Sequence, residues 1–129
     1  MARDSLPVAF IDWVTAGQAS RLEEIAATAW LNAQLHDDDI AERQGLPGAQ
    51  ARAAQLRSFA DGYRLAAADR RGLVTGMIEY AIRDSAAEAV QARVTPQSGD
   101  RGALWAIAWR ARSAAWMVRH RSLLENALT

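Results

Sequence analysis

Two residue types that carry much of protein chemistry are missing from this chain of 129 residues, which has no cysteine and no lysine. Without cysteine there is no disulfide framework, no thiolate nucleophile and no cysteine-ligated metal. The 15 basic residues are therefore all arginines, and they balance 15 acidic residues to a net charge of zero. Because binding to a phosphate backbone relies on positive charge, we expect no nucleic-acid partner.

Long hydrophobic runs are also missing, although half of the residues are hydrophobic. The apolar runs are only a few residues long, whereas a helix that crosses a bilayer needs about 20 apolar residues. Met1 to Ser5 lead into the next segment without the basic and apolar regions of a signal peptide. We therefore expect a cytoplasmic protein that makes no contact with a membrane.

Most of the chain has the pattern of a single helical domain. Alanine is abundant, and apolar residues recur at helical spacing throughout residues 20–128. We expect helices over residues 21–35, 38–43, 49–63, 70–94 and 101–127, with turns at Gly45-Leu46-Pro47-Gly48 and Thr95-Pro96-Gln97-Ser98-Gly99-Asp100. The predicted fold class is mainly all-α, a bundle of about five helices that forms one domain over residues 1–129.

Residues 1–17 differ from the rest, because residues 7–13 are rich in β-favouring side chains and Thr15-Ala16-Gly17 resembles a turn. Ser20 and Glu23 then have the spacing of a capping box at the start of a helix. A lone strand leaves an unpaired edge, which must be paired or covered. We expect either a homodimer that pairs this strand across a symmetry axis or an extended arm that packs against the helices.

Several segments resemble one known family. They are Pro7-Val8-Ala9-Phe10-Ile11-Asp12-Trp13, Thr15-Ala16-Gly17, Ser20-Arg21-Leu22, Ala29-Trp30, Leu35-His36-Asp37-Asp38-Asp39, Gly45-Leu46-Pro47, the helix over 57–63 and Val118-Arg119-His120-Arg121. Together they are similar to the C-terminal helical part of aminoglycoside phosphotransferase-like proteins, and they cover nearly the whole chain. The resemblance implies the C-terminal subdomain of a kinase-like fold.

By this resemblance Asp12 is a metal-ligand position, since a carboxylate at the end of such a strand binds the Mg²⁺ ions that bridge nucleotide phosphates. Val14 stands where the family has a second acid. The phosphate-binding lysine and the His-Gly-Asp catalytic loop are absent, so we expect no catalysis by the chain alone, and no cofactor.

The resemblance thus implies a truncated, non-catalytic relative of an antibiotic- or small-molecule phosphotransferase, acting in small-molecule binding or protein interaction. Two alternatives stay open. The chain is the C-terminal half of a split phosphotransferase, with Mg²⁺ and nucleotide bound only when a separate N-terminal half completes it, or it is a non-functional gene fragment that still folds.

Three indoles on the last predicted helix are the candidate ligand site. Trp105, Trp109 and Trp116 lie on one stripe beside a face of Leu104, Ala108, Ala111, Ala115 and Val118 that we expect in the core. The indoles serve core or dimer packing, or they form a pocket for a small aromatic or cationic molecule with Arg112 and Glu79 as polar partners. Packing is expected first for Trp105, and ligand contact for Trp109 with Arg112.

Other polar groups favour structural roles. Asp37, Asp38 and Asp39 beside His36 suggest a metal cluster, but consecutive carboxylates before a helix more often cap it and complement its dipole. His120 lies in a basic cluster near a helix end, where it also complements the dipole.

Overall fold

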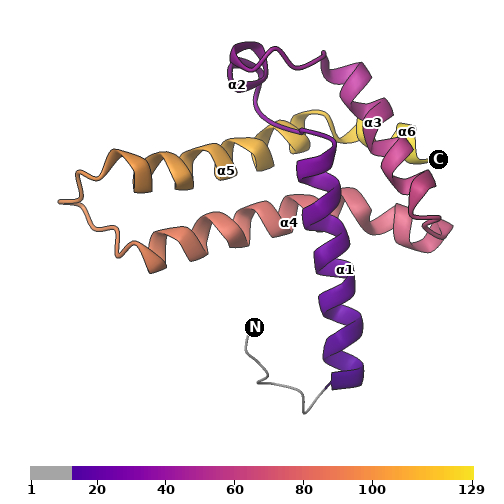
Figure 1. Cartoon of the computed structure of the whole chain (residues 1–129), viewed down its shortest axis with the longest axis horizontal. Helices are drawn as coiled ribbons and strands as arrows, with labels where there is room; N and C mark the ends of the chain where they lie inside the picture. The colour runs from indigo at the N-terminus through magenta and orange to yellow at the C-terminus, as the bar shows by residue number, and fades with distance from the viewer. Residues whose placement is uncertain (1–12) are drawn as a thin grey trace.

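The computed structural model describes residues 13–129, with side chains from residue 21 onwards. All regular elements in this part are helices, and there are six: α1 (Trp13–Asn32), α2 (Asp38–Arg43), α3 (Ala49–Gly62), α4 (Ala67–Gln91), α5 (Arg101–Arg119) and α6 (Arg121–Leu128) (Figure 1). The predicted all-α class is therefore confirmed for this part of the chain, while the likeness to a kinase-like subdomain stays a prediction. None of the described helices combines the length and the apolar character that a bilayer span requires.

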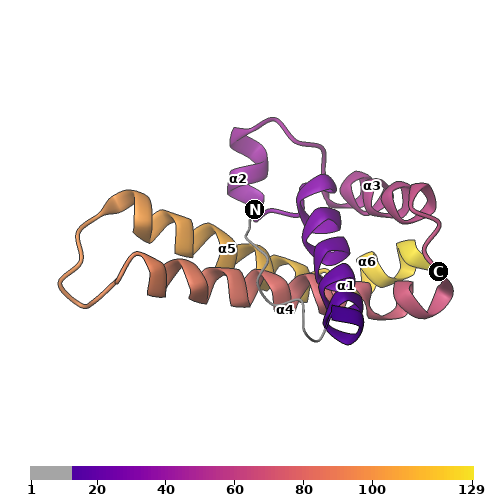
Figure 2. The ribbon, with the colours of Figure 1, turned by 60° about the horizontal axis from the view of Figure 1, so that its bottom comes forward.

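Helices α4 and α5 form an antiparallel hairpin (Figure 1). Helix α1 crosses the first half of α4, and α3 and α6 pack together near the start of α4. The half of the hairpin nearest its turn extends beyond the other helices in both views (Figures 1 and 2). The core is consequently concentrated where α1, α3, α6 and the base of the hairpin meet.

The core combines large aromatic and aliphatic side chains with closely packed alanines. Its largest apolar members, all with less than 2% of their surface exposed, are Trp30, Trp116, Leu35, Leu56, Met77, Met117, Leu124 and Val74. The indole N–H of Trp30 donates to the Leu35 carbonyl at 3.2 Å, so this buried polar group is satisfied. Alanines at 29, 33, 60 and 81 are fully buried and let the helix backbones approach closely.

Helix ends explain how the bundle turns so sharply between its elements. Asp37 caps α2 as predicted, and Asp100 caps α5 by accepting from the amides of Gly102 and Ala103. Helices α1, α3 and α4 are followed by Gln34, Arg64 and Arg93 with φ between 53° and 60°, the left-handed cap that glycine usually provides. These ends carry no glycine signal, so the sequence pattern does not reveal their geometry.

The start of α1 corrects the predicted strand and turn. Helix α1 begins at Trp13 and runs through Thr15-Ala16-Gly17, so the turn predicted there is wrong, and Ser20 is not the start of a helix. Gly17 within α1 costs the helix only about 1 kcal/mol, compared with about 3 kcal/mol for a proline, and the residues around it are compatible with a helix. Residues 7–11 of the predicted strand and Asp12 lie outside the described residues.

The last predicted helix is in fact two helices. His120, with φ −106° and ψ 20°, ends α5 and precedes α6. The break lets α6 turn back onto α3 and α4 and bury Leu124 and Leu128. A straight helix through residue 127 would leave those two leucines without a core to enter, so burial favours the kink.

The apolar face predicted for α5 is also wrong. Leu104 is 39% exposed and Val118 is 54% exposed, whereas Ser113, Ala114, Trp116 and Met117 are buried. The apolar residues of α4 divide in the same way: Ile82 and Val90 are exposed by 54% and 78%, whereas the buried ones include Leu73, Met77, Ile78 and Ala81. The spacing of apolar residues alone does not indicate which face of α4 or α5 packs against another helix, because part of the hairpin extends beyond α1.

Candidate functional site

One buried arginine fixes the turn between α1 and α2. Arg52 of α3 is 2% exposed and donates from Nη1 to the carbonyls of Gln34 and His36, each at 2.9 Å. Its Nε donates to the Pro47 carbonyl at 2.9 Å, and its guanidinium carbon lies 4.4 Å from the ring centroid of Trp116. The planar fork thus binds both ends of the segment around α2 at once.

The three consecutive aspartates at the start of α2 bind side chains of α5. Asp37 accepts from Arg112 Nε at 2.9 Å and from Arg119 Nη2 at 3.0 Å, Asp39 accepts from Arg112 Nη2, and Asp38 accepts from the indole N–H of Trp116 at 2.7 Å. Burial raises the pKa of Asp37, but the Asp38 amide and the two arginines outweigh that effect and the pKa is lowered overall. The carboxylates act as a clamp between α2 and α5, with Arg112 shared by Asp37 and Asp39. Within residues 13–129, no group of three or more acidic or histidine side chains is arranged to hold a metal ion.

Beside this clamp lies a pocket of about 430 Å³ with indole walls. It is lined by the end of α1, the turn, α2 and α5, through Leu31, His36, Ile40, Arg43, Gln44, Trp105 and Trp109. Trp109 is partly buried, with its ring centroid 5.6 Å from that of Trp30 and the Arg110 guanidinium carbon 4.4 Å from its ring. Trp105 is 46% exposed and has Arg112 at 5.9 Å from its ring. We call this feature the tryptophan pocket.

The structure brings part of the predicted site together and separates the rest. Trp105 and Trp109 share the tryptophan pocket, and Arg112 lies at its edge. Trp116 is fully buried and its N–H is used by Asp38, so the expectation that Trp105 would be the packing indole is wrong for this helix. Glu79 lies on α4, along a different groove. Whether any of these residues binds a ligand stays a prediction.

His36 is a pocket residue that sequence reasoning considered only as a metal ligand. Among the described residues, nothing hydrogen-bonds its buried Nδ1, and its ring meets Trp109 edge-on with centroids 5.8 Å apart. Burial lowers its pKa, and the charge of Arg52 lowers it further. His36 therefore lines the tryptophan pocket and carries a buried polar atom without a hydrogen-bond partner, which no sequence pattern could have identified.

His120, predicted to complement a helix dipole, stacks on Trp116 with ring centroids 4.1 Å apart. Its Nδ1 lies 2.9 Å from the Trp116 carbonyl at the end of α5. The ring therefore supports the kink between α5 and α6 and lies behind the clamp, outside the residues that line the tryptophan pocket.

Comparison with known proteins gives one clear relative. The chain is 52% identical, over 128 residues, to the trifolitoxin immunity protein of Rhizobium leguminosarum bv. trifolii. The match covers 99% of this chain and 49% of the relative, so the chain spans about half the length of that protein. No family model matches the chain. No solved structure matches it either.

This relative corrects the predicted family. Identity of 52% over nearly the whole chain is a much stronger likeness than a short Ile-Asp-Trp segment and a helical pattern, and the relative carries the name of an immunity protein. The resemblance to aminoglycoside phosphotransferase-like proteins is therefore wrong, as are the functions that it implied: a pseudoenzyme, half of a split phosphotransferase, or a fragment of one. The metal role of Asp12 rested on that resemblance alone.

Proposed function

We propose that this chain takes part in immunity to a toxin, trifolitoxin or one of its kind, and that it does so by binding the toxin. The observation that carries the proposal is the 52% identity to the trifolitoxin immunity protein over 128 residues. The chain spans 49% of that relative, so the proposal includes the claim that the matching half of the relative contributes to protection.

The tryptophan pocket is the surface that we propose for toxin contact. Exposed indoles are strong anchors at interfaces because they bury a large rigid area and still offer an N–H donor. Arg110 and Arg112 already lie near the indole faces, and the pocket lining contains Arg43 and no acidic side chain. Arg112 is paired with Asp37 and Asp39, and Arg110 with Asp84, so the charge of the lining itself comes from Arg43. That charge favours a neutral or acidic part of a toxin over a cationic one.

Expression in a trifolitoxin-sensitive strain tests the proposal. Cells that carry the gene should grow at toxin concentrations that stop cells with an empty vector. Trp105→Ala should abolish most of this protection without unfolding the protein, because the side chain is nearly half exposed. Tyr63→Ala, at the residue that follows α3, is the matched control, an exposed aromatic that does not line the pocket, and it should protect like the parent chain.

Two results would contradict the proposal at different points. If cells that contain the folded chain are as sensitive as the vector control, the immunity function is wrong for this half of the relative. If Trp105→Ala protects fully at an equal protein level, immunity stands and the tryptophan pocket is not the contact surface. Immunoblots and circular dichroism of the purified variants give the protein levels and the fold.

We also propose that the protein forms a homodimer through the projecting hairpin. Exposed apolar side chains on its two helices support this proposal, among them Ile82, Val90, Leu104 and Val118. Apolar surface of this kind is commonly covered by a partner. A second copy is the simplest partner that a soluble helical hairpin can have.

A further inference from the structure

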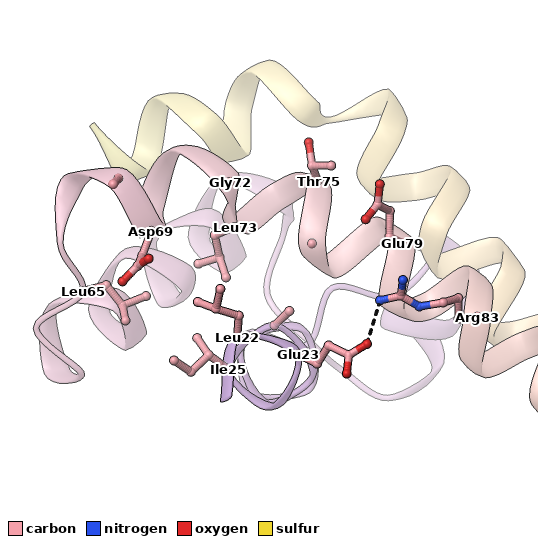
Figure 3. Close-up of a pocket in the computed structure, with 13 residues that line it drawn as sticks. Leu22, Glu23, Ile25, Leu65, Asp69, Gly72, Leu73, Thr75, Glu79 and Arg83 are labelled. Carbon is pink, nitrogen blue, oxygen red and sulfur yellow. Dashed lines mark hydrogen bonds and ion pairs between the residues drawn. The ribbon is translucent and has the colours of Figure 1, made fainter. Parts of the chain in front are cut away.

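A second hollow lies beside residues 22–26 of α1, away from the end of α1 that lines the tryptophan pocket, where α1 crosses the first half of α4 (Figure 3). This α1–α4 groove has a volume of about 500 Å³ and shares no lining residue with the tryptophan pocket. Its floor is apolar, with Ile25, Leu65 and Leu73 buried, and Leu22 at its edge is 49% exposed. A hollow of this size accommodates a small organic molecule or a few side chains of a peptide.

Two glycines on α4 line the groove. A Cβ added at Gly76 would lie 3.5 Å from the Cβ of Ala26, an ordinary van der Waals contact, so the approach of α1 to α4 does not require glycine there. A Cβ added at Gly72 would meet nothing within 4 Å, so close approach does not explain that glycine. Glycine is unfavourable inside a helix, and at Gly72, an exposed residue that lines the groove, the missing side chain leaves open space. The space at Gly72 is therefore a feature of the groove itself.

Charge around the groove is predominantly negative. Its lining includes three carboxylates, Glu23, Asp69 and Glu79, and one base, Arg83, which leaves an excess of two negative charges. Glu23 accepts from Arg83 at 3.1 Å (Figure 3), and within the described residues Asp69 and Glu79 form no ion pair. Ten residues separate these two acids along α4, which at 1.5 Å per residue places them about 15 Å apart, one toward each end of the groove.

We propose that the α1–α4 groove binds a small cationic amphiphile, a molecule with an apolar body and an amine or guanidinium group. The apolar body covers Leu22, Ile25 and Leu73 and enters the space at Gly72, while the cation lies near Asp69 or Glu79. This site goes beyond the proposed immunity function and does not depend on it, because the two hollows have opposite charge and separate linings.

Three probes of one size and different charge test this proposal in the purified protein. They are 4-phenylbutylamine, 4-phenylbutanol and 4-phenylbutyrate, titrated at pH 7 and low salt while backbone amide shifts are followed by NMR. The amine should shift amides of residues 22–26, 65–76 and 79–83 and bind at least tenfold more tightly than the butyrate, with the alcohol between them. Equal affinities, or shifts confined to other parts of the protein, would overturn the proposal.

Variants on α4 separate the shape of the groove from its charge. Gly72→Leu should fill the space and weaken both amine and alcohol at least tenfold without lowering the melting temperature, while Ala87→Leu, an exposed position outside the groove, should bind like the parent chain. Asp69→Asn with Glu79→Gln should weaken the amine several-fold and leave the alcohol unchanged. Unchanged amine binding in this pair would contradict the charge argument even if Gly72→Leu failed to fold.

Discussion

Replacing Arg52 with methionine tests how the segment around α2 is held. Arg52 is 2% exposed and makes three hydrogen bonds of 2.9 Å to backbone carbonyls. Hydrogen bonds that involve a charged group contribute about 1.5–3 kcal/mol each, but such terms are not additive, and methionine keeps part of the packing against Trp116. We expect a loss of about 4 kcal/mol, somewhat less than the sum of three such bonds, because three backbone carbonyls lose their donor.

Urea unfolding followed by circular dichroism measures this loss. With a slope of about 2 kcal/mol per molar urea, 4 kcal/mol lowers the midpoint by about 2 M. Arg57→Met is the matched control, because Arg57 on the same helix is 53% exposed and its bonds are to the Ala127 carbonyl at 3.3 Å and to Asp61 at 3.7 Å. It should lose less than about 1 kcal/mol. At that slope, a shift of about 0.5 M corresponds to about 1 kcal/mol. An Arg52→Met midpoint that lies closer than this to the parent midpoint would show that Arg52 does not hold the segment around α2.

Three further predictions concern single groups. The pKa of His36 in the folded protein is below its ordinary value of 6.5, so the unfolded chain binds the proton first as pH falls. The contribution of the neutral imidazole to stability is therefore full above pH 6.5 and is lost as pH falls through the folded pKa. His36→Gln should flatten this part of a curve of stability against pH. Trp116→Phe leaves Asp38 without its 2.7 Å donor and should cost about 1–3 kcal/mol in thermal unfolding, and an unchanged melting temperature would show that the bond is unimportant. Leu104→Arg should convert the proposed dimer to a monomer, as measured by sedimentation at tens of micromolar protein, a concentration typical for moderate interfaces. A parent chain that is already monomeric at this concentration would contradict the dimer.

The helices were largely predictable because apolar periodicity and polar caps are local signals. The turn at Gly45-Leu46-Pro47-Gly48 and the Asp37 cap follow from residue types within a few positions, and both occur in the structure. The start of α1 and the kink at His120 were not predictable in this way. The kink depends on what α6 buries, namely Leu124 and Leu128 against a core formed by distant segments.

The candidate site was predictable in composition but not in arrangement. Helical spacing placed Trp105, Trp109 and Trp116 near one another, yet it could not show that Trp116 would be fully buried while Trp105 stayed 46% exposed. Arg112 contacts Asp37, 75 residues away in the sequence, and Asp39, 73 residues away. The spacing of residues within one helix does not indicate pairs at such separations. The family resemblance failed for a related reason, since short segments and a helical pattern recur in unrelated proteins.

Direct binding is the measurement that tests the central claim, that this chain contacts the toxin through the tryptophan pocket. Purified protein is titrated with trifolitoxin while tryptophan fluorescence is recorded, for the parent chain and for Trp105→Phe, which keeps an aromatic ring and removes one emitter. We expect a saturable change in the parent chain that is mostly lost in the variant, since Trp105 is the exposed indole of the pocket. No saturable change in a folded parent chain would contradict it.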